Sequence, residues 1–228
     1  MTVPLPLCVI GAGSIGMRHI EVAQASAAVE LTAVVEADAD RRAVLAGQGL
    51  PVAPAIDAVP PHTRAAVIAT PTGDHRDSAL AAVSRGWGII VEKPLAGTLD
   101  DARAVIAAAQ AAGVPLFTGH HRRCHPFSLA ARDAIAEIGE PVGVQALWSL
   151  RKHDTYYDVP WRRAAGAGPL MSNLSHEIDL MRFLMGDMVE VSALVSSARR
   201  GLVIEDTAAL ALRFANGEMG SVLMSDAG

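Results

Sequence analysis

Short apolar runs alternate with helix-forming stretches over the first half of the chain. The runs lack the polar–apolar alternation of a half-exposed strand, which is typical of parallel strands covered on both faces. Local motifs predict both ends of one helix: Thr98 and Asp101 form a capping box at its start, and Gly113 follows its last turn. We expect strands at residues 5–10, 31–35, 51–53, 65–69, 88–92 and 116–119, and a further helix at about 73–86. This alternation predicts a doubly wound parallel sheet.

The pattern changes after about residue 126. A helix at about 126–138 precedes longer runs with strand character, and a helix at about 175–184, closed by Gly186, interrupts them. We expect these strands at residues 142–152, 189–199, 207–214 and 218–225. Strands that follow one another without helices indicate a second, largely antiparallel sheet. We therefore predict an α/β Rossmann domain over residues 1–122 and an α+β substrate and oligomerisation domain over residues 123–228.

The first apolar run leads directly into the sequence GAGSIG at residues 11–16, and Glu36 ends the second run, twenty residues after Gly16. Gly11 would permit the tight strand-to-helix turn, Gly13 would let a pyrophosphate approach the backbone, and Gly16 would let the helix pack closely. Free N–H groups at the helix start would then face the phosphates. Glycines alone also mark ordinary turns, but with the strand, the helix and the acid they predict dinucleotide binding.

Glu36 also bears on the choice of cofactor. Its carboxylate would accept hydrogen bonds from the adenosine ribose and would repel a 2′-phosphate, which favours NAD over NADP. Arg41 and Arg42 follow and could soften this preference, so NADP stays possible. A solvated helix face is the simpler interpretation of the two arginines.

Composition narrows the class of protein. Of 228 residues, 51% are hydrophobic and 19% are charged, as in a folded globular protein. The net charge of −5 gives no reason to expect a nucleic-acid partner. Cys8 and Cys124 form no disulfide framework, so we expect reduced thiols. The chain shows no signal peptide and no apolar run near the ~18 residues of a membrane span, so we expect a soluble, cytoplasmic protein.

Two loops at the carboxyl ends of predicted strands carry polar chemistry. Residues 70–75, TPTGDH, follow the fourth strand and are placed either to touch the cofactor or to form a plain turn. Glu92, Lys93 and Pro94 end the fifth strand. Beside an oxidised nicotinamide, the ring's positive charge and desolvation would disfavour the ammonium form of Lys93. Such a lysine can give or take a proton at neutral pH.

A histidine in the second half is a candidate for acid–base chemistry. Ser172, His176 and Asp179 are spaced to share one face of a helix, behind the turn at residues 166–168. A lone histidine on a helix is usually structural, but polar neighbours on the same face favour a role in proton transfer.

A second histidine cluster superficially resembles a metal site. It contains His120, His121, Cys124 and His125. Zinc sites usually pair such a cluster with a second, distant one, and the sequence shows none, so we expect no metal.

Taken together, these motifs resemble the glucose–fructose oxidoreductase/inositol dehydrogenase (Gfo/Idh/MocA) family over the whole chain. The resemblance rests on VIGAGSIG, ATPTGDH, EKP (92–94), GHHRRCHP (119–126), WRR (161–163) and SNLSHEIDLMRFLMG (172–186). EKP combined with the later histidine helix is its most specific part. It implies a two-domain NAD(P)-dependent dehydrogenase of sugars, cyclitols and related hydroxy compounds, assembled as a homo-oligomer through the C-terminal sheet.

The resemblance also implies roles for single residues. Lys93 and His176 would be the catalytic pair. The nucleotide would be bound by Gly11, Gly13, Ser14, Ile15, Gly16, Glu36, Thr70, Pro71, Thr72, His75 and Glu92, by His121 near the carboxamide, and by Trp161 and Arg162, which would close over it. The substrate would contact Arg123, Lys152, Asn173 and Asp179.

The chain departs from the family pattern at two places. An aspartate often stands four residues before the histidine, where this chain has Ser172, so Asp179 or Asn173 could orient the imidazole instead. Relatives usually continue beyond the position of Gly228, so we expect a C-terminal domain that is truncated relative to the family.

The predicted reaction is the oxidation of a secondary alcohol with NAD. His176 would remove the hydroxyl proton, and Lys93 would polarise the oxygen while hydride passes to the nicotinamide. Arg122, Arg123, Arg151 and Lys152 suggest an anionic substrate such as a sugar acid, although ordinary surface arginines explain them equally well. The alternatives are NAD-dependent, redox-assisted glycoside cleavage and a non-catalytic cofactor-binding regulator. Lys93 and His176 together argue against the regulator.

Overall fold

The computed structural model describes residues 3–228, apart from the side chain of Trp161. The chain divides into two compact units, the first ending at Gly119 and the second comprising His120–Gly228. No helix among the described residues has the length and apolarity needed to span a bilayer.

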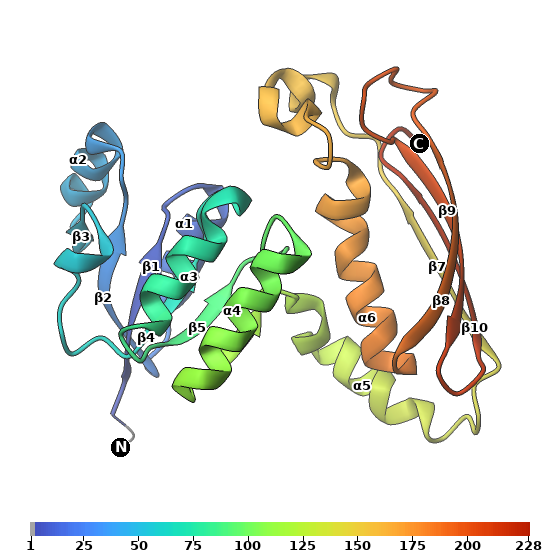
Figure 1. Ribbon diagram of the computed structural model, residues 1–228, viewed down its shortest axis with the longest axis horizontal. Helices are drawn as coiled ribbons and strands as arrows, with labels where there is room; N and C mark the ends of the chain where they lie inside the picture. Colours follow the sequence, from blue (N-terminus) through green and yellow to red (C-terminus); the bar gives the residue numbers. More distant parts are fainter. Residues whose placement is uncertain (1–2) are drawn as a thin grey trace. The chain divides into compact units, whose positions relative to one another are not determined.

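Unit 1 is built on a parallel sheet (Figure 1). Its strands are β1 (Leu5–Ile10), β2 (Val29–Val35), β3 (Val52–Ala53), β4 (Ala65–Ile68), β5 (Gly88–Val91) and β6 (Leu116–Thr118), in the spatial order β3-β2-β1-β4-β5-β6. Between them lie α1 (Ser14–Ala25), α2 (Ala39–Gly47), α3 (His75–Val83) and α4 (Leu99–Ala112), with short 3₁₀ turns η1 (Ile56–Ala58) and η2 (Thr72–Asp74). The doubly wound sheet is confirmed. At α4, the Thr98 hydroxyl accepts the Asp101 N–H, as the capping box predicts.

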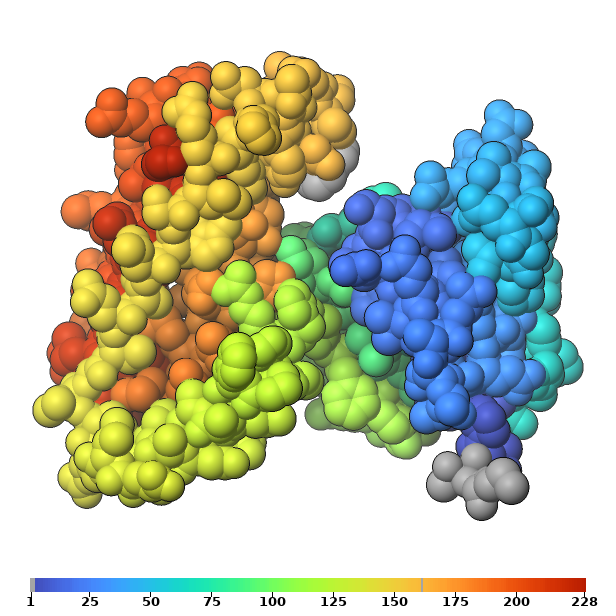
Figure 2. All heavy atoms as spheres, turned by 180° about the vertical axis from the view of Figure 1, so that it is seen from behind, coloured from blue at the N-terminus to red at the C-terminus, as the bar shows by residue number. Residues whose placement is uncertain are grey.

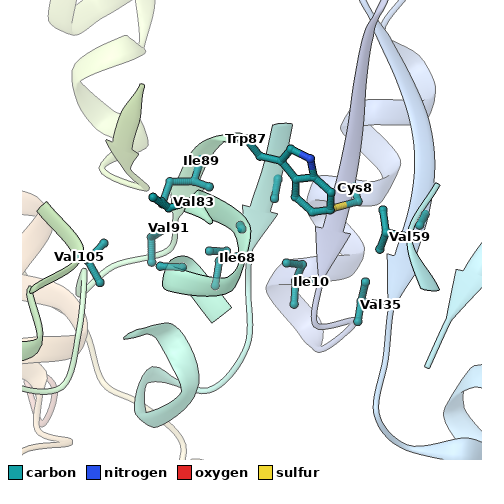
Figure 3. Packing of buried hydrophobic residues seen from close by; sticks show 14 of the residues in the cluster. Cys8, Ile10, Val35, Val59, Ile68, Val83, Trp87, Ile89, Val91 and Val105 are labelled. Carbon is teal, nitrogen blue, oxygen red and sulfur yellow. The ribbon is translucent and has the colours of Figure 1, made fainter. Parts of the chain in front are cut away.

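Both faces of this sheet are buried because successive residues of each strand point to opposite sides. From β1, Cys8 and Ile10 pack on the side covered by α3 and α4 (Figure 3). Leu7 and Val9 face the opposite side, where they meet residues of α1 and α2. Figure 2 shows this second side from outside, covered by the blue segment of α1 and the lighter blue segment of α2. Each fully buried Ile or Val contributes about 1.5–3 kcal/mol, which explains the continuous apolar runs.

Unit 2 combines helices with a second sheet. It contains η3 (His121–Cys124), α5 (Pro126–Ile135), β7 (Gly143–Ser149), η4 (Asp154–Asp158), η5 (Pro160–Arg163), a π-helical turn η6 (Leu170–Leu174), α6 (Ser175–Met185), β8 (Met188–Ser196), β9 (Thr207–Phe214) and β10 (Met219–Ser225). The strand order is β7-β10-β9-β8. The pairs β8–β9 and β9–β10 are antiparallel, as the prediction of a largely antiparallel sheet requires, and β7 and β10 run parallel, so the sheet as a whole is mixed.

The core of unit 2 lies between α6 and one face of this sheet (Figure 1). Met181 and Met185 of α6 are buried in the same cluster as Leu212 and Phe214 of β9. The other face of the sheet is open, with Leu147, Leu194 and Leu223 exposed on it. Thus α6 is held by apolar packing along one side, which fixes the orientation of its polar side.

Candidate nucleotide site and histidine cluster

The glycine turn after β1 has the geometry of a phosphate-binding loop. Gly11 has φ +92°, and a Cβ there would lie 2.8 Å from the Ala69 backbone. A Cβ on Gly16 would lie 2.0 Å from the Gly11 carbonyl oxygen, so α1 packs against the turn only with glycine at that position. Gly13 caps α1 without a side-chain hydrogen bond, and a Cβ on it would meet nothing within 4 Å. The first N–H groups of α1, from Ser14 and Ile15 onward, therefore fit a pyrophosphate.

Glu36 lies against this turn. Its Oε2 accepts the Ala12 N–H at 3.2 Å, and its Oε1 accepts the Asp38 N–H at 3.0 Å. Arg41 Nε lies 3.6 Å from Oε2 and donates to the Ala12 carbonyl at 2.8 Å. Arg42 donates to the carbonyls of Glu36 and Ala37. Both arginines are thus anchored on the loop that carries Glu36, a role that a purely solvated helix face does not include.

The loop after β4 contributes a buried hydroxyl and a buried imidazole. Thr70 Oγ1 is buried and has no hydrogen-bond partner among the described residues, which fits a group that binds a ligand. Pro71 and Thr72 lead into η2. His75 is 2% exposed, with Nε2 3.0 Å from the Thr70 carbonyl and Nδ1 2.8 Å from the Pro94 carbonyl. Both ring nitrogens therefore face the protein, and the ring ties the loop after β4 to the loop after β5.

The loop after β5 holds Lys93 next to a hydrogen-bonded histidine–glutamate pair. Glu92 Oε1 lies 2.8 Å from His19 Nε2 of α1, and Oε2 accepts the Lys93 N–H at 3.2 Å. Burial acts to raise the pKa of Glu92, but the hydrogen bond and charge of His19, together with Lys93, outweigh it and keep the pKa below its ordinary value. The Lys93–Pro94 peptide bond is cis.

These loops share one edge of the sheet. Because β1, β2, β4 and β5 are parallel, the segments that follow them leave at the same carboxyl edge. The glycine turn, Glu36, Thr70 and Lys93 therefore lie along that edge.

In unit 2, histidines gather around the start of α6. The ring centroids of His121 and His176 are 4.9 Å apart, and those of His120 and His176 are 5.9 Å apart, both edge-on. His120 Nδ1 lies 3.4 Å from Asp179 Oδ1. His176 is 9% exposed. The structure therefore brings His121, His176 and Asp179 together and adds His120, which sequence reasoning considered only as a metal ligand.

Arginines from η3 pair with carboxylates on α6. Arg123 binds Asp179 through both Nε, at 2.8 Å, and Nη2, and Arg122 binds Glu177. The hydrogen bonds that Arg123 donates to Asp179 raise the pKa of Arg123. Asp179 thus serves Arg123 and His120 at once, so its charge is shared within the cluster.

The predicted common face of Ser172, His176 and Asp179 assumed a regular α-helix. In the structure Ser172 lies in the π-helical turn η6, whereas His176 and Asp179 lie in α6. Asn173 also lies in η6, and its Nδ2 is buried without a hydrogen-bond partner in the part of the chain described. Such a donor fits a substrate oxygen.

Two further predicted site residues, Arg162 and Lys152, contact other parts of the protein. Arg162 donates to the Tyr156 carbonyl and stacks over the Tyr156 ring at 4.2 Å. Lys152 Nζ lies 3.7 Å from the buried Asp226 carboxylate and 4.4 Å from the Tyr156 ring centroid. The side chain of Trp161 lies outside the described residues. Over residues 3–228, no group of three or more His, Cys, Asp or Glu side chains is arranged to hold a metal ion.

His19 is the main residue that sequence reasoning missed. It lies three residues after Gly16, on the helix of the glycine motif, and its partner Glu92 is 73 positions away. The only available signal was its place on that helix, since nothing local pairs it with the fifth strand.

Comparison with known proteins decides the family. The sequence profile of the "Oxidoreductase family, NAD-binding Rossmann fold" matches residues 6–120, and that of the "GFO/IDH/MocA C-terminal domain" matches residues 128–227. The chain belongs to the GFO/IDH/MocA oxidoreductase family. Unit 1 is its NAD(P)-binding Rossmann domain.

Several known proteins are similar to this chain over most of its length. The chain is 34% identical to 1,5-anhydro-D-fructose reductase of Ensifer adhaerens over 218 residues, covering 91% of this chain and 65% of that protein. Two solved structures are similar in fold. GenD2 from gentamicin A biosynthesis, in complex with NAD, has a TM-score of 0.86 at 28% identity and is matched over 100% of this chain and 67% of that one. The WlbA dehydrogenase from Bordetella pertussis, in complex with NADH and UDP-GlcNAcA, has a TM-score of 0.88 at 25% identity, over 99% and 71%. The chain spans 57–65% of the length of the first curated relatives that it matches.

Proposed function

We propose that this protein is an NAD-dependent dehydrogenase that oxidises a secondary alcohol of a sugar or cyclitol. The observation that carries the proposal is the position of Lys93, which follows β5 at the same sheet edge as the glycine turn and Glu36. A lysine placed there lies on the side of the sheet where the nucleotide is held. The similarity to 1,5-anhydro-D-fructose reductase supports a sugar-like substrate.

In this proposal the nucleotide is held by groups from unit 1. The N–H groups at the start of α1 bind the pyrophosphate, Glu36 binds the adenosine ribose, and Thr70 offers its buried hydroxyl. Bound NAD supplies the hydride acceptor. Because Glu36 would repel a 2′-phosphate, we propose a preference for NAD, which Arg41 beside it moderates.

The proton is handled by groups of the protein. His176, as a neutral imidazole, accepts the proton of the substrate hydroxyl. Lys93 donates a hydrogen bond to the same oxygen and stabilises the negative charge that develops on it. Asn173 offers a further donor to a substrate oxygen.

The structure supports a sugar acid as the substrate less well than the sequence did. Of the four cationic residues that suggested an anionic substrate, Arg122, Arg123 and Lys152 have carboxylate partners within the protein. Among the described residues, no carboxylate forms an ion pair with Arg151. A cation already paired with a carboxylate attracts a substrate carboxylate less. We therefore favour a neutral polyol or sugar.

We also propose a homo-oligomer that uses the open face of the unit 2 sheet. Leu147, Leu223, Ala209 and Leu194 lie opposite one another in register across β7, β10, β9 and β8. Leu147, Leu223 and Leu194 are 70%, 49% and 79% exposed. Such an apolar row across a sheet is typical of a protein interface.

A screen for NADH formation over polyols, aldoses and sugar acids tests the function. The reverse reaction, with NADH and the matching ketones and 1,5-anhydro-D-fructose, is measured in parallel. We expect turnover with at least one neutral polyol or sugar. Release of a glycosidic leaving group without net NADH would identify glycoside cleavage instead. Tight NAD binding without turnover in either direction would contradict the proposal and identify a cofactor-binding regulator.

A further inference from the structure

The segment around Lys93 is held from one side by a hydrogen-bonded pair, His19 and Glu92. The Glu92 side chain is 11% exposed, and both of its oxygens have protein partners, His19 Nε2 and the Lys93 N–H. It is also tightly packed, because a Cβ on Gly119 would come within 2.9 Å of its carboxyl group. The carboxylate therefore has little freedom to move, and the peptide N–H of Lys93 is positioned by it.

The same segment is held from the other side by His75. The buried ring contacts the Pro94 carbonyl at 2.8 Å and the Thr70 carbonyl at 3.0 Å. A neutral ring donates to one of these carbonyls and a protonated ring to both. Lys93 thus lies between two anchored neighbours, Glu92 and Pro94, and His19 is the group that anchors the first of them.

His19 also belongs to the helix that begins at the phosphate-binding turn. It lies on α1, which starts at Ser14 directly after Gly13. A shift of α1 therefore moves the partner of Glu92, and through Glu92 the backbone of Lys93. Misplacement of a reacting group by about 1 Å costs up to ~10²-fold in rate, so this link bears directly on turnover.

We infer that His19 is a positioning residue that places Lys93 through the carboxylate of Glu92. This inference rests on the proposed function, in which Lys93 contacts the substrate oxygen. His19 itself makes no contact with substrate in this arrangement. The hydrogen bond of His19 fixes the position of the Glu92 carboxylate, which in turn fixes the position of the Lys93 backbone.

The chain allows a test that needs no substrate, because it has only two lysines, Lys93 and Lys152. Reductive methylation with ¹³C-formaldehyde labels both lysine amines and the N-terminal amine, and Lys152→Arg and Lys93→Met variants assign the two lysine NMR signals. In His19→Ala we expect the Lys93 signal to shift or broaden while the Lys152 signal stays in place. In His19→Gln, whose amide can donate to Glu92, the Lys93 signal should return toward its wild-type position.

A matched control comes from an exposed pair of the same kind. His62 Nε2 lies 3.6 Å from Glu30 Oε1, and both side chains are more than half exposed. His62→Ala should leave both lysine signals unchanged. Should His19→Ala not fold, as judged by thermal unfolding, His19→Asn replaces it, because its shorter amide does not reach Glu92.

Kinetics then separate this inference from the proposed function. With the best sugar from the screen, we expect His19→Ala to lower kcat by roughly tenfold to a hundredfold and to change the Kd of NAD by less than about threefold. In a Lys93→Met background, the His19 substitution should have little further effect on kcat. An unchanged Lys93 signal in folded His19→Ala or His19→Asn, or a full additive loss of kcat in the double variant, overturns the inference. A Lys93→Met variant with normal turnover overturns the proposed function instead.

Discussion

The ring of His121 meets the ring of His176 edge-on, with their centroids 4.9 Å apart. His121 comes from η3 and His176 from α6, elements that also exchange the Arg122–Glu177 and Arg123–Asp179 ion pairs. The contact restricts how the largely buried His176 ring can rotate. A ring with a restricted orientation is suited to directional proton transfer.

If His176 is the base, it accepts a proton only when neutral. Activity in the oxidation direction should then rise with pH as the imidazole loses its proton, which occurs near pH ~6.5 for an ordinary histidine. His176→Asn and His176→Gln should abolish this rise and lower kcat, since neither amide accepts the proton. Steady-state rates across the pH range check this. Variants that lose thermal stability but keep the wild-type pH profile would identify His176 as a packing residue.

Two substitutions of Lys93 distinguish electrostatic stabilisation by its positive charge from proton transfer by its amine. Lys93→Met should leave NAD binding nearly unchanged and lower kcat by about 10²-fold or more, the scale of losing an acid–base or oxyanion partner. Lys93→Arg keeps the charge but does not release a proton. Partial activity in Lys93→Arg would indicate electrostatic stabilisation, and a loss equal to that of Lys93→Met would indicate proton transfer. Near-normal turnover of Lys93→Met removes the residue from the mechanism.

Glu36 should control the choice between NAD and NADP. In the wild-type protein we expect the Kd of NAD to be lower than that of NADP. Glu36→Ala should bring the two dissociation constants closer together, because it removes both the hydrogen bonds to the ribose and the repulsion of the 2′-phosphate. Arg41 then becomes available to the 2′-phosphate, which should increase NADP affinity. Titrations monitored by fluorescence measure both dissociation constants. Asp40→Ala, an exposed acid in the first turn of α2, is the matched control and should leave the ratio unchanged.

The stability contributed by Glu92 should depend on pH in the acid range. The folded-state pKa of Glu92 lies below its ordinary value of 4.5, so its stabilising contribution is complete above that value and is lost as the pH falls through the folded pKa. The difference in unfolding free energy between wild type and Glu92→Gln should therefore shrink as the pH falls below about 4.5. Denaturant unfolding at several pH values checks this. If this difference in unfolding free energy grew as the pH fell, the pKa of Glu92 would be raised in the folded state instead of lowered.

The thiols should differ sharply in reactivity. Both are free, and Cys8 is fully buried in β1, where burial raises the pKa of its thiol to about 12. Cys124 is exposed. Because the thiolate is the reactive form, a thiol reagent should modify Cys124 alone in the folded protein and both cysteines in denaturant. Mass spectrometry of the labelled peptides measures this, and Cys124→Ser serves as the control. Rapid native labelling of Cys8 would contradict its buried position.

Much of the fold of unit 1 could be predicted from the sequence, because its strands, its glycine turn and its helix cap depend on residues close together in the chain. A strand buried on both faces, such as β1, must be apolar throughout, and Gly11 and Gly16 stand where a Cβ would collide with backbone. The capping box at Thr98 is likewise complete within one helical turn. Such features depend on neighbours in the chain, so their pattern predicts them.

Tertiary structure decided which of these residues meet. The sequence placed Glu92 at the end of a strand, but only the packing of α1 on the sheet shows that His19 is its partner. It also predicted one helical face for Ser172, His176 and Asp179, but only the structure shows a π-helical turn at Ser172 and places His120 beside Asp179. The parallel pairing of β7 with β10 is equally invisible in either strand alone. Apolar and glycine patterns act over a few residues, whereas ion pairs and strand partners join residues far apart in the chain, and only packing of the whole unit selects them.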